Sequence, residues 1–353
     1  MRAICFEDIA KLKVSDLAEP TVIESSDCIV QVEMAGLCGS DLHPYWGREK
    51  GLDPGTVMGH EFVGKIVQLG SNVPGLAVGE RVFAPFSTNC GDCYFCNHGL
   101  PSRCRRGQLF GWRSNGNGLH GGQAEFVRVP LASGTLLKVP DGMSSELALL
   151  LGDNLSTGYF CTELAETKPG GVYAVLGCGN VGLMALSAAK LKGCHNLVAF
   201  DLIAERREMA EQLGAIVVSS TEAAIATVSR LTDGRGADAV MELVGMPDAQ
   251  RLAYELVRPG GTIATVGCHC DSTFAFSPVD AYDKNLTYRT GRCPARFYME
   301  KLAELEELQN FNWRSFITHC FSLDDGPIAY DLFSKRKQRD RQGVFDLPLR
   351  ELS

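Results

Sequence analysis

The sequence contains no long hydrophobic run and no excess of basic charge. No stretch of about 18 consecutive apolar residues occurs, so we expect no membrane-spanning helix. Its 353 residues include 34 Lys and Arg against 42 Asp and Glu, a formal net charge of −8. That balance argues against nucleic acid or an anionic membrane as the main partner. The N-terminal residues lack the basic and apolar regions of a signal peptide, so we expect a cytoplasmic protein.

The composition is otherwise that of an ordinary globular protein, apart from its cysteines. Hydrophobic residues make up 45% and charged residues 22% of the chain. At about 150 residues per domain, the length favours two domains. Without a secretory signal, the 14 cysteines indicate metal ligation or burial rather than disulfides. Four of them cluster between residues 90 and 104, and we expect most of the others to be small buried side chains.

Two patterns divide the chain. Up to about residue 150, short β-rich runs alternate with Gly and Pro turns, which predicts an irregular antiparallel sheet with strands at 28–36, 62–70 and 80–85. From about 153 to 291, apolar strands alternate with helices, which predicts a buried parallel sheet. The expected strands are 172–176, 196–200, 215–218, 238–243 and 262–267, and the expected helices are 180–193 and 204–214.

The last part of the chain has a charged, helical pattern, clearest at 298–311. We expect this tail to return to the first domain. The basic run 335–341 is interpreted as a solvated surface. Just before the tail, the β-prone stretch 285–291 predicts the last strand of the parallel sheet. Its exposed edge would need covering, and pairing with a second copy across a two-fold axis would satisfy both edges, so we hypothesise a homodimer at least.

A glycine-rich motif opens the first helix of the parallel region. Gly177, Gly179 and Gly182 follow an apolar strand and enclose Asn180 and Val181. The three glycines allow a tight turn, a close approach of backbone to pyrophosphate, and close packing of helix on strand. The free N–H groups at the helix start then favour phosphate. This context predicts a dinucleotide-binding fingerprint.

The end of the next strand indicates which dinucleotide binds. Asp201 lies 19 residues after Gly182 (201 − 182). A carboxylate there accepts hydrogen bonds from both adenosine ribose hydroxyls and repels a 2′-phosphate, which favours NAD over NADP. Asp201 has helix capping as its alternative role. Arg206 either shifts this preference or is a solvated helix residue.

Two groups of residues have the composition of zinc sites. Four cysteines in C-x2-C-x2-C-x7-C spacing predict a closed, structural zinc shell, with an iron–sulfur cluster as the weaker alternative: Cys90, Cys93, Cys96 and Cys104. The second group is scattered and comprises Cys38, His60, Glu61 and Asp153. Taken singly, its members also fit a buried cysteine, a core histidine and a helix-capping aspartate. Together, beside a dinucleotide fingerprint, they predict a second metal site.

Nearly the whole chain resembles the zinc-containing medium-chain dehydrogenase/reductase family, the alcohol dehydrogenases. The resemblance is carried by GLCGSDLH (36–43), GHEFVG (59–64), the cysteine loop, GDNLSTGY (152–159) and GCGNVG (177–182) followed by Asp201. It implies an α/β protein with a β-rich GroES-like catalytic domain and a Rossmann doubly wound nucleotide-binding domain. The implied bounds are 1–152, 153–291, and 292–353 returning to the catalytic domain.

The resemblance also implies roles for individual residues. Cys38, His60 and Asp153 would bind a catalytic zinc. In polyol-type members the Glu of the GHE motif binds zinc directly, so Glu61 is a ligand or exchanges with substrate or water. Ser40 and His43 occupy proton-relay positions and Thr157 contacts the nicotinamide, with turn capping, a core or surface histidine and helix capping as their alternatives. Three aromatic residues either line an apolar pocket or pack in the core: Trp46, Phe86 and Phe110.

These observations predict a zinc-dependent alcohol dehydrogenase. It would bind two zinc ions per chain and transfer hydride reversibly between a small alcohol and an aldehyde or ketone, with NAD as cofactor. Its partners would be that small molecule and other copies of itself, as a homodimer or homotetramer. One alternative is an NADPH-dependent zinc carbonyl or enal reductase, which Asp201 argues against. The other is a catalytically inactive binding protein, which the intact ligand and glycine positions argue against.

Overall fold

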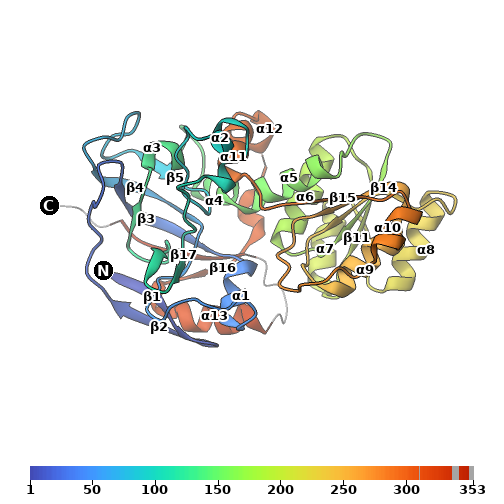
Figure 1. The fold of residues 1–353 in the computed structure, drawn as a ribbon, viewed down its shortest axis with the longest axis horizontal. Coiled ribbons are helices and arrows are strands. Elements are labelled where there is room, and N and C mark those ends of the chain that lie inside the picture. The colour runs from blue at the N-terminus through green and yellow to red at the C-terminus, as the bar shows by residue number, and fades with distance from the viewer. Residues whose placement is uncertain (310, 336–341, 350–353) are drawn as a thin grey trace. The chain divides into compact units, whose positions relative to one another are not determined.

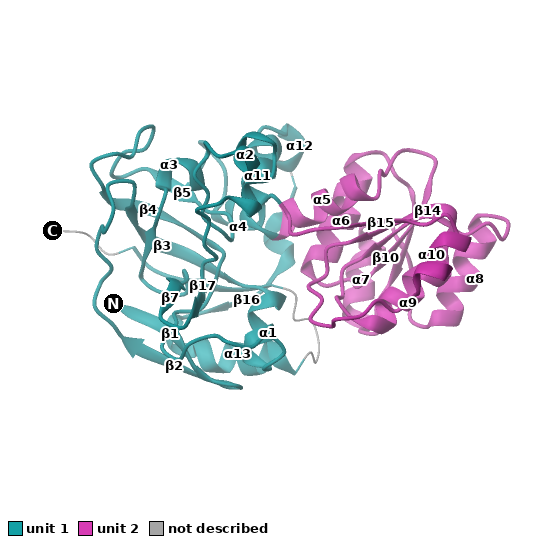
Figure 2. Ribbon diagram, viewed as in Figure 1, with its two compact units in different colours: residues 1–153, 294–353 teal, residues 154–293 magenta. Residues whose placement is uncertain are grey.

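The computed structural model describes residues 1–309, 311–335 and 342–349. All of the predicted basic surface run after Lys335 lies outside the described residues. The chain forms two compact units, shown in different colours in Figure 2. The first comprises residues 1–153 and 294–353, and the second comprises residues 154–293. The tail therefore belongs to the same unit as the N-terminal region.

The first unit is built on a seven-stranded sheet with the order β16-β17-β3-β4-β5-β9, in which β8 also pairs with β3 (Figure 1). Only β16 and β17 pair in parallel; the other pairs are antiparallel. The strands are β3 (Cys28–Leu37), β4 (Phe62–Leu69), β5 (Arg81–Phe83), β8 (Phe126–Val129), β9 (Leu137–Lys138), β16 (Ile317–Phe321) and β17 (Gln342–Asp346). Two hairpins accompany the sheet: β1 (Arg2–Asp8) with β2 (Lys11–Asp16), and β6 (Trp112–Ser114) with β7 (Asn117–Leu119).

Short helices surround this sheet. Ser144 caps the longest of the early ones, α4, by accepting a hydrogen bond from the Leu147 N–H. The α-helices of the unit are α1 (Leu42–Tyr45), α2 (Tyr94–Asn97), α3 (Ala132–Thr135), α4 (Ser145–Gly152), α11 (Ala295–Ala303), α12 (Glu306–Gln309) and α13 (Gly326–Ser334). The 3₁₀ helices are 39–41, 101–103, 313–316 and 323–325. The helical pattern at 298–311 corresponds to α11 and α12.

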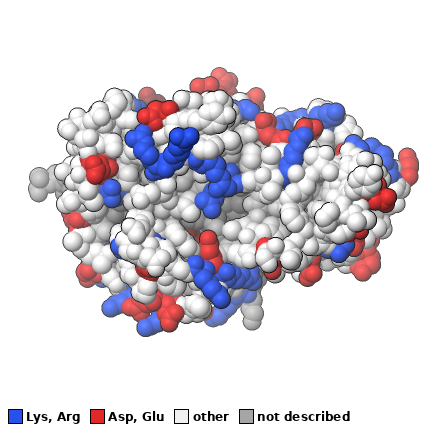
Figure 3. All heavy atoms as spheres, in the orientation of Figure 1, with Lys and Arg blue, Asp and Glu red and all other residues white. Residues whose placement is uncertain are grey.

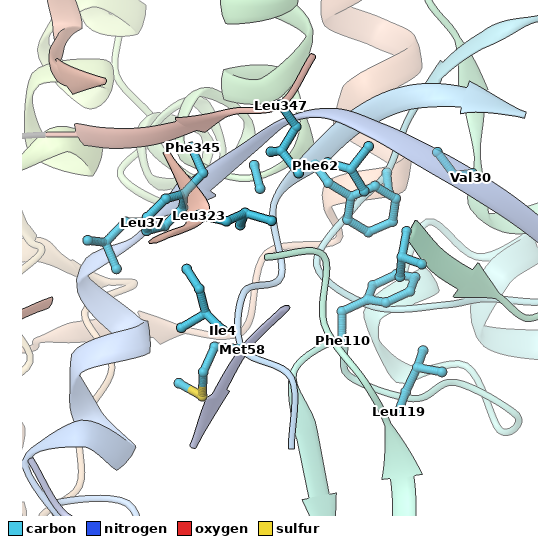
Figure 4. Packing of buried hydrophobic residues seen from close by; sticks show 14 of the residues in the cluster. Ile4, Val30, Leu37, Met58, Phe62, Phe110, Leu119, Leu323, Phe345 and Leu347 are labelled. Carbon is cyan, nitrogen blue, oxygen red and sulfur yellow. The ribbon is translucent and has the colours of Figure 1, made fainter. Parts of the chain in front are cut away.

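The core of the first unit joins residues from both of its chain segments (Figure 4). Phe62 and Phe110 pack edge to face, with ring centroids 5.0 Å apart. From the tail, Phe345 joins the same buried cluster as Leu37. Phe110, which is 3% exposed, is therefore a core residue of this unit.

The second unit contains a six-stranded sheet, parallel throughout, with the order β12-β11-β10-β13-β14-β15. Its central strand β10 is buried along its whole length, as expected for a parallel sheet covered on both faces. The strands are β10 (Val172–Leu176), β11 (Asn196–Phe200), β12 (Ile216–Val218), β13 (Ala237–Glu242), β14 (Val257–Thr265) and β15 (Thr287–Thr290). The predicted parallel sheet is confirmed, and the strand predicted at 285–291 is its edge strand β15.

The helices of the second unit alternate with these strands. They are α5 (Asn154–Leu164), α6 (Asn180–Leu191), α7 (Ala204–Gln212), α8 (Thr221–Leu231), α9 (Pro247–Leu256) and α10 (Pro278–Asp283). The strand order reverses between β10 and β13, where parallel α/β sheets form a ligand crevice at the carboxyl ends of their strands. The glycine motif begins directly after β10 and therefore lies at this position.

Acidic and basic side chains are scattered over the face shown in Figure 3, among wide areas of other residues. Within the described ranges, no helix is both long and apolar enough to cross a membrane.

Candidate metal centres and nucleotide site

The four clustered cysteines converge in the loop between β5 and β6. Their sulfur atoms are 3.4 Å apart for Cys90 and Cys104, 3.6 Å for Cys93 and Cys96, and 3.9 Å for both Cys90–Cys96 and Cys93–Cys104. A tetrahedral shell with Zn–S bonds of about 2.3 Å requires sulfur separations of about 3.8 Å. The loop therefore fits a zinc ion closed off by four sulfurs.

Hydrogen bonds and burial act on the cysteine sulfurs and the backbone of this loop. The Cys90 N–H donates to the Cys104 sulfur at 3.3 Å. Backbone N–H groups, that of Cys96 first, lower the pKa of Cys93 to about 6. Arg106 joins the two limbs of the loop by donating to both carboxylate oxygens of Asp92, at 2.9 and 3.0 Å. The N–H donors favour the deprotonated sulfur at Cys93, whereas burial outweighs them and raises the pKa of Cys96 to about 12 and that of Cys104 above its ordinary value.

The second group of predicted ligands also converges, at the edge of the first unit's sheet. One ligand atom from each of Cys38, His60, Glu61 and Asp153 lies within 4.8 Å of the others. Cys38 directly follows β3, and His60 and Glu61 directly precede β4. Because β3 and β4 are antiparallel neighbours, the end of one meets the start of the other. Asp153 is the C-cap of α4, which contacts both strands.

The distances and charges in this cluster fit a bound cation. Asp153 Oδ2 lies 3.2 Å from His60 Nε2 and 3.8 Å from the Cys38 sulfur. Tetrahedral zinc with one S, one N and one O ligand requires separations of about 3.4–3.6 Å. Asp153 is 8% exposed and Glu61 only 1% exposed, so two carboxyl groups are buried in the same cluster. A bound cation would offset this concentration of negative groups.

The pKa values of the cluster residues are shifted in directions that agree with this concentration of carboxyl groups. Burial, with the nearby Glu61 and Asp153 carboxylates, raises the pKa of Cys38 to about 12. Burial and the Asp153 charge raise the pKa of Glu61 well above its usual value. Burial alone would lower the pKa of His60, but the Asp41 and Asp153 carboxylates outweigh it and raise that pKa. The net effect of burial and the neighbouring carboxylates is therefore to shift all three pKa values in the direction that retains protons, and a bound cation would favour their release.

Sequence reasoning missed two buried residues that support this site. Asp41 Oδ1 lies 2.9 Å from His60 Nδ1, and its Oδ2 accepts the Cys38 N–H at 2.9 Å. A carboxylate on Nδ1 directs Nε2 toward a metal. Gln342 donates from Nε2 to Glu61 Oε2 at 2.7 Å. Asp41 had a local signal, since it lies three residues after Cys38 in the same motif, but Gln342 had none.

Of the two predicted relay residues, Ser40 contacts the ligand cluster and His43 lies further along the same segment, on α1. Ser40 Oγ is 3.3 Å from the Cys38 sulfur and 3.2 Å from His60 Nε2, so the hydroxyl borders the ligand cluster. His43 is buried on α1, with its ring centroid 6.4 Å from that of Trp46. Of the other two predicted aromatic residues, Phe86 is a buried core residue and Phe110 packs on Phe62.

The glycine motif has the geometry that a pyrophosphate loop needs. Gly177 has a φ of +91°, which only glycine adopts without strain. A Cβ on Gly182 would lie 1.8 Å from the Gly177 carbonyl oxygen, so helix α6 can start only if this residue is glycine. Asn180 is the first residue of α6 and Val181 follows it. The helix N-terminus therefore opens at the carboxyl end of β10.

Asp201 is held at the end of β11 by backbone donors. Its Oδ2 accepts the Cys178 N–H at 2.8 Å and its Oδ1 accepts the Ile203 N–H at 2.9 Å. A carboxylate has about four lone-pair positions, so two remain for a ligand. Arg206 Nη1 lies 3.8 Å from Asp201 Oδ2. Thr157 lies on α5, which packs closely on α6 in the same unit.

Comparison with known proteins agrees with both parts of the structure. Residues 24–141 match the family described as "Alcohol dehydrogenase GroES-like domain", and residues 180–307 match "Zinc-binding dehydrogenase". The chain is 37% identical over 350 residues to "Zinc-type alcohol dehydrogenase B" of Aspergillus flavus, covering 96% of this chain and 79% of that protein. The chain belongs to the zinc-containing alcohol dehydrogenase family.

Solved structures of alcohol dehydrogenases share the whole fold. The alcohol dehydrogenase TADH from Thermus sp. ATN1 superimposes with a TM-score of 0.91 at 35% identity, covering 99% of this chain and 100% of that one. Zinc-dependent alcohol dehydrogenase 2 from Streptococcus pneumonia gives 0.90 at 29% identity, with complete coverage of both chains. This alcohol dehydrogenase family member thus has the predicted fold class, a GroES-like domain and a nucleotide-binding domain with a parallel sheet.

Proposed function

We propose that this oxidoreductase transfers hydride reversibly between an alcohol and NAD, producing an aldehyde or ketone. The observation that supports the proposal most directly is the convergence of Cys38, His60, Glu61 and Asp153 in one buried cluster. In this proposal residues 1–153 and the returning tail hold the metal chemistry, and residues 154–293 hold the dinucleotide.

The catalytic metal ligands would be Cys38, His60 and Asp153, with Glu61 beside them. When bound, zinc would polarise the substrate oxygen as a Lewis acid, and NAD would accept the hydride. Asp41 would orient His60 through Nδ1, so that Nε2 is available to the metal. The four cysteines 90, 93, 96 and 104 would hold a second, structural zinc.

The alcohol proton needs an acceptor within the protein. Ser40 Oγ borders the ligand cluster and both accepts and donates hydrogen bonds, so it would take the first position of a relay. His43 would release the proton to solvent, since an imidazole has an ordinary pKa of about 6.5. Both residues follow Cys38 in one short segment, so the same turn positions the ligand and the relay.

The adenosine half of the cofactor would bind at Asp201. Its two remaining lone-pair positions suit the two ribose hydroxyls, and its charge would repel a 2′-phosphate. Gly177, Gly179 and Gly182 would receive the pyrophosphate at the start of α6, together with Asn180 and Val181, and Thr157 would contact the nicotinamide. Arg206 favours the second candidate, an NADPH-dependent carbonyl or enal reductase, because its guanidinium lies 3.8 Å from Asp201 and would attract a phosphate.

A substrate panel read at the nicotinamide absorbance would test the proposal. Alcohols would be supplied with NAD or NADP, and aldehydes, ketones and enals with NADH or NADPH. We expect turnover of alcohols with NAD and its loss in Cys38→Ser. Zinc analysis should give two zinc ions per chain in the wild type and one in a Cys38→Ser, His60→Ala double variant. A double variant that retains both ions would contradict the site, and exclusive reduction of enals or ketones with NADPH would establish the second candidate.

A further inference from the structure

The pair formed by Glu61 and Gln342 is buried and spans almost the whole chain. Gln342 Nε2 donates to Glu61 Oε2 at 2.7 Å, across a sequence separation of 281 residues. Glu61 is 1% exposed and Gln342 is fully buried. A Cβ on Gly36 would lie 1.9 Å from Glu61 Oε2 and 2.8 Å from Gln342 Nε2. Glycine at position 36 is therefore what leaves room for the hydrogen bond.

The sheet topology fixes this donor in place. Strands β17, β3 and β4 are consecutive neighbours and pair antiparallel. The end of β3, which leads to Cys38, therefore meets the starts of both β4 and β17. Gln342 is the first residue of β17, and its carbonyl oxygen accepts a hydrogen bond from Thr318 Oγ1 at 3.2 Å. Its backbone is thus held from β16 on one side while its amide reaches toward Glu61.

The chemistry of the donor is what gives the pair its significance. Gln342 is neutral, so it satisfies an oxygen of Glu61 without neutralising the charge. A nearby cation favours the charged form of Glu61, and a buried carboxylate in that form is strongly attracted to the cation. The amide hydrogen bond opposes that attraction, because a turn of the Glu61 carboxylate toward the metal would move Oε2 and lengthen or bend the bond from Gln342. The two interactions compete for one side chain.

We propose that Gln342 is a positioning residue that restrains Glu61 and thereby limits how far this carboxylate enters the coordination shell of the catalytic metal. The inference rests on the proposed function, since it requires a metal held by Cys38, His60 and Asp153. With the restraint, a coordination position stays open for substrate. Without it, Glu61 competes for that position.

Replacement of Gln342 by Met tests the proposal, because Met has a similar length and lacks the amide donor. The catalytic metal would be exchanged for Co²⁺, whose visible absorption reports coordination number. In Gln342→Met we expect weaker visible bands, as a higher coordination number produces, and several-fold slower loss of metal to a chelator. Gln342→Leu removes the same donor with a different shape and provides the test if the Met variant does not fold.

A variant that lacks the Glu61 carboxylate separates the proposed positioning role of Gln342 from a general effect on packing. In a Glu61→Gln protein, the additional change Gln342→Met should leave the cobalt spectrum unmoved, because no carboxylate remains to be released. Gln250→Met is the matched control: Gln250 is a buried glutamine of the second unit that donates to the Tyr288 hydroxyl, and its loss should reduce stability without altering the spectrum.

The outcomes distinguish a failure of the proposed function from a failure of the positioning role of Gln342. The proposed function itself predicts a cobalt–thiolate absorption band that is present in the wild type and lost when Cys38 is replaced. The absence of such a band would overturn it. Where that band is present, an unchanged spectrum and unchanged metal loss in Gln342→Met would overturn the positioning role alone. A spectral shift that persists in the Glu61→Gln background would overturn it as well, since the effect would then not act through the carboxylate.

Discussion

At the scale of single residues, neighbouring groups give similar carboxylates different roles. Asp153 Oδ2 lies 3.2 Å from His60 Nε2, so it would bind the proposed metal directly. Asp41 contacts Nδ1 of the same ring and would orient the imidazole without binding the metal itself. Asp201, in the second unit, keeps lone pairs available while backbone N–H groups hold it in place. Position relative to donors, rather than residue type, separates these three roles.

Asp41→Asn should weaken binding of the catalytic metal. The variant keeps the size of the side chain and removes the charge that supports the His60 imidazole, a change that typically lowers metal affinity about 10–100-fold. Metal retention against a graded series of chelator concentrations would measure this. The structural zinc serves as the internal control and should be retained, so equal retention of both ions in variant and wild type would contradict the role of Asp41.

Asp201→Ser should move cofactor preference toward NADP. The change removes both a ribose hydrogen-bond acceptor and the repulsion of a 2′-phosphate, and losing roughly 1.4 kcal/mol of discrimination corresponds to about tenfold. The ratio of kcat/KM for NAD and NADP, measured on wild type and variant, reports the shift. Because Asp201 also accepts two backbone N–H groups, the melting temperature is recorded as a control. A wild type that already prefers NADP would refute the assignment.

At the scale of elements, the proposed function gives the cysteine loop a structural role and the segment after β3 a chemical one. The loop between β5 and β6 contains only two short helical turns, α2 and the 3₁₀ helix 101–103. Most of its backbone hydrogen bonds close short turns, such as the bond from the Cys104 N–H to the Pro101 carbonyl, and four metal–sulfur bonds would join these turns to one another.

Cys104→Ser should therefore lower stability far more than turnover per folded molecule. Losing one of four sulfur ligands opens the shell and releases the loop, while the second ligand cluster keeps all its residues. Thermal unfolding and specific activity of the soluble fraction would be measured side by side, with Cys320→Ser, an exposed cysteine outside both clusters, as the control. Lost turnover with unchanged melting would mean that the loop is catalytic.

A partly buried ion pair joins the end of β13 to the segment that follows β14 in the second unit. Glu242 is fully buried, and its Oε2 lies 2.8 Å from His269 Nε2. Its hydrogen bond raises the pKa of His269 above the ordinary value. Since the folded-state pKa is the higher one, the stabilisation is fully present below about pH 6.5 and is lost as the pH rises through the raised pKa.

His269→Gln should accordingly destabilise the chain more at low pH than at high pH. Chemical denaturation of wild type and variant at pH 6 and pH 9 would give the difference in free energy of unfolding at each pH. We expect the difference to shrink at pH 9, where the wild-type imidazole is neutral. A difference that grows with pH would reverse the sign and exclude the ion pair as its cause.

At the scale of the whole molecule, the parallel sheet leaves an edge at β15. The strand pairs with β14 and ends the strand order. Large apolar side chains are exposed on the neighbouring segment: Phe274 is 60%, Val279 75% and Tyr282 86% exposed. The Phe274 and Tyr288 ring centroids are 5.2 Å apart, which places one of these side chains against β15. An unpaired edge beside exposed apolar groups favours assembly of two copies through this side of the sheet.

Thr287→Pro should weaken that assembly, since proline cannot donate to a strand ladder. Light scattering at micromolar concentration would show a shift toward monomer. Ile216→Pro is the matched control, because it makes the same change in β12, the opposite edge strand of the same sheet, and should leave assembly intact. A wild type that is monomeric at this concentration would refute the hypothesis.

Local spacing in the sequence was sufficient for much of this protein. The alternation of strands and helices between 153 and 291 predicted the parallel sheet because each buried strand is apolar along its length. The four-cysteine loop and the glycine motif were readable because all their residues lie within one turn or loop. The helical pattern at 298–311 corresponds to α11 and α12, whereas β16 and β17 were not anticipated in the tail.

Only the tertiary structure decided which distant residues meet. Cys38 and Glu61 come together because β3 and β4 pair antiparallel, and Gln342 joins them because β17 adds to the same edge. Phe110 was left open between a pocket and the core, and packing against Phe62 decided for the core. A sequence specifies its turns and periodicities locally, whereas the register of strands far apart in the chain depends on which apolar faces become buried together.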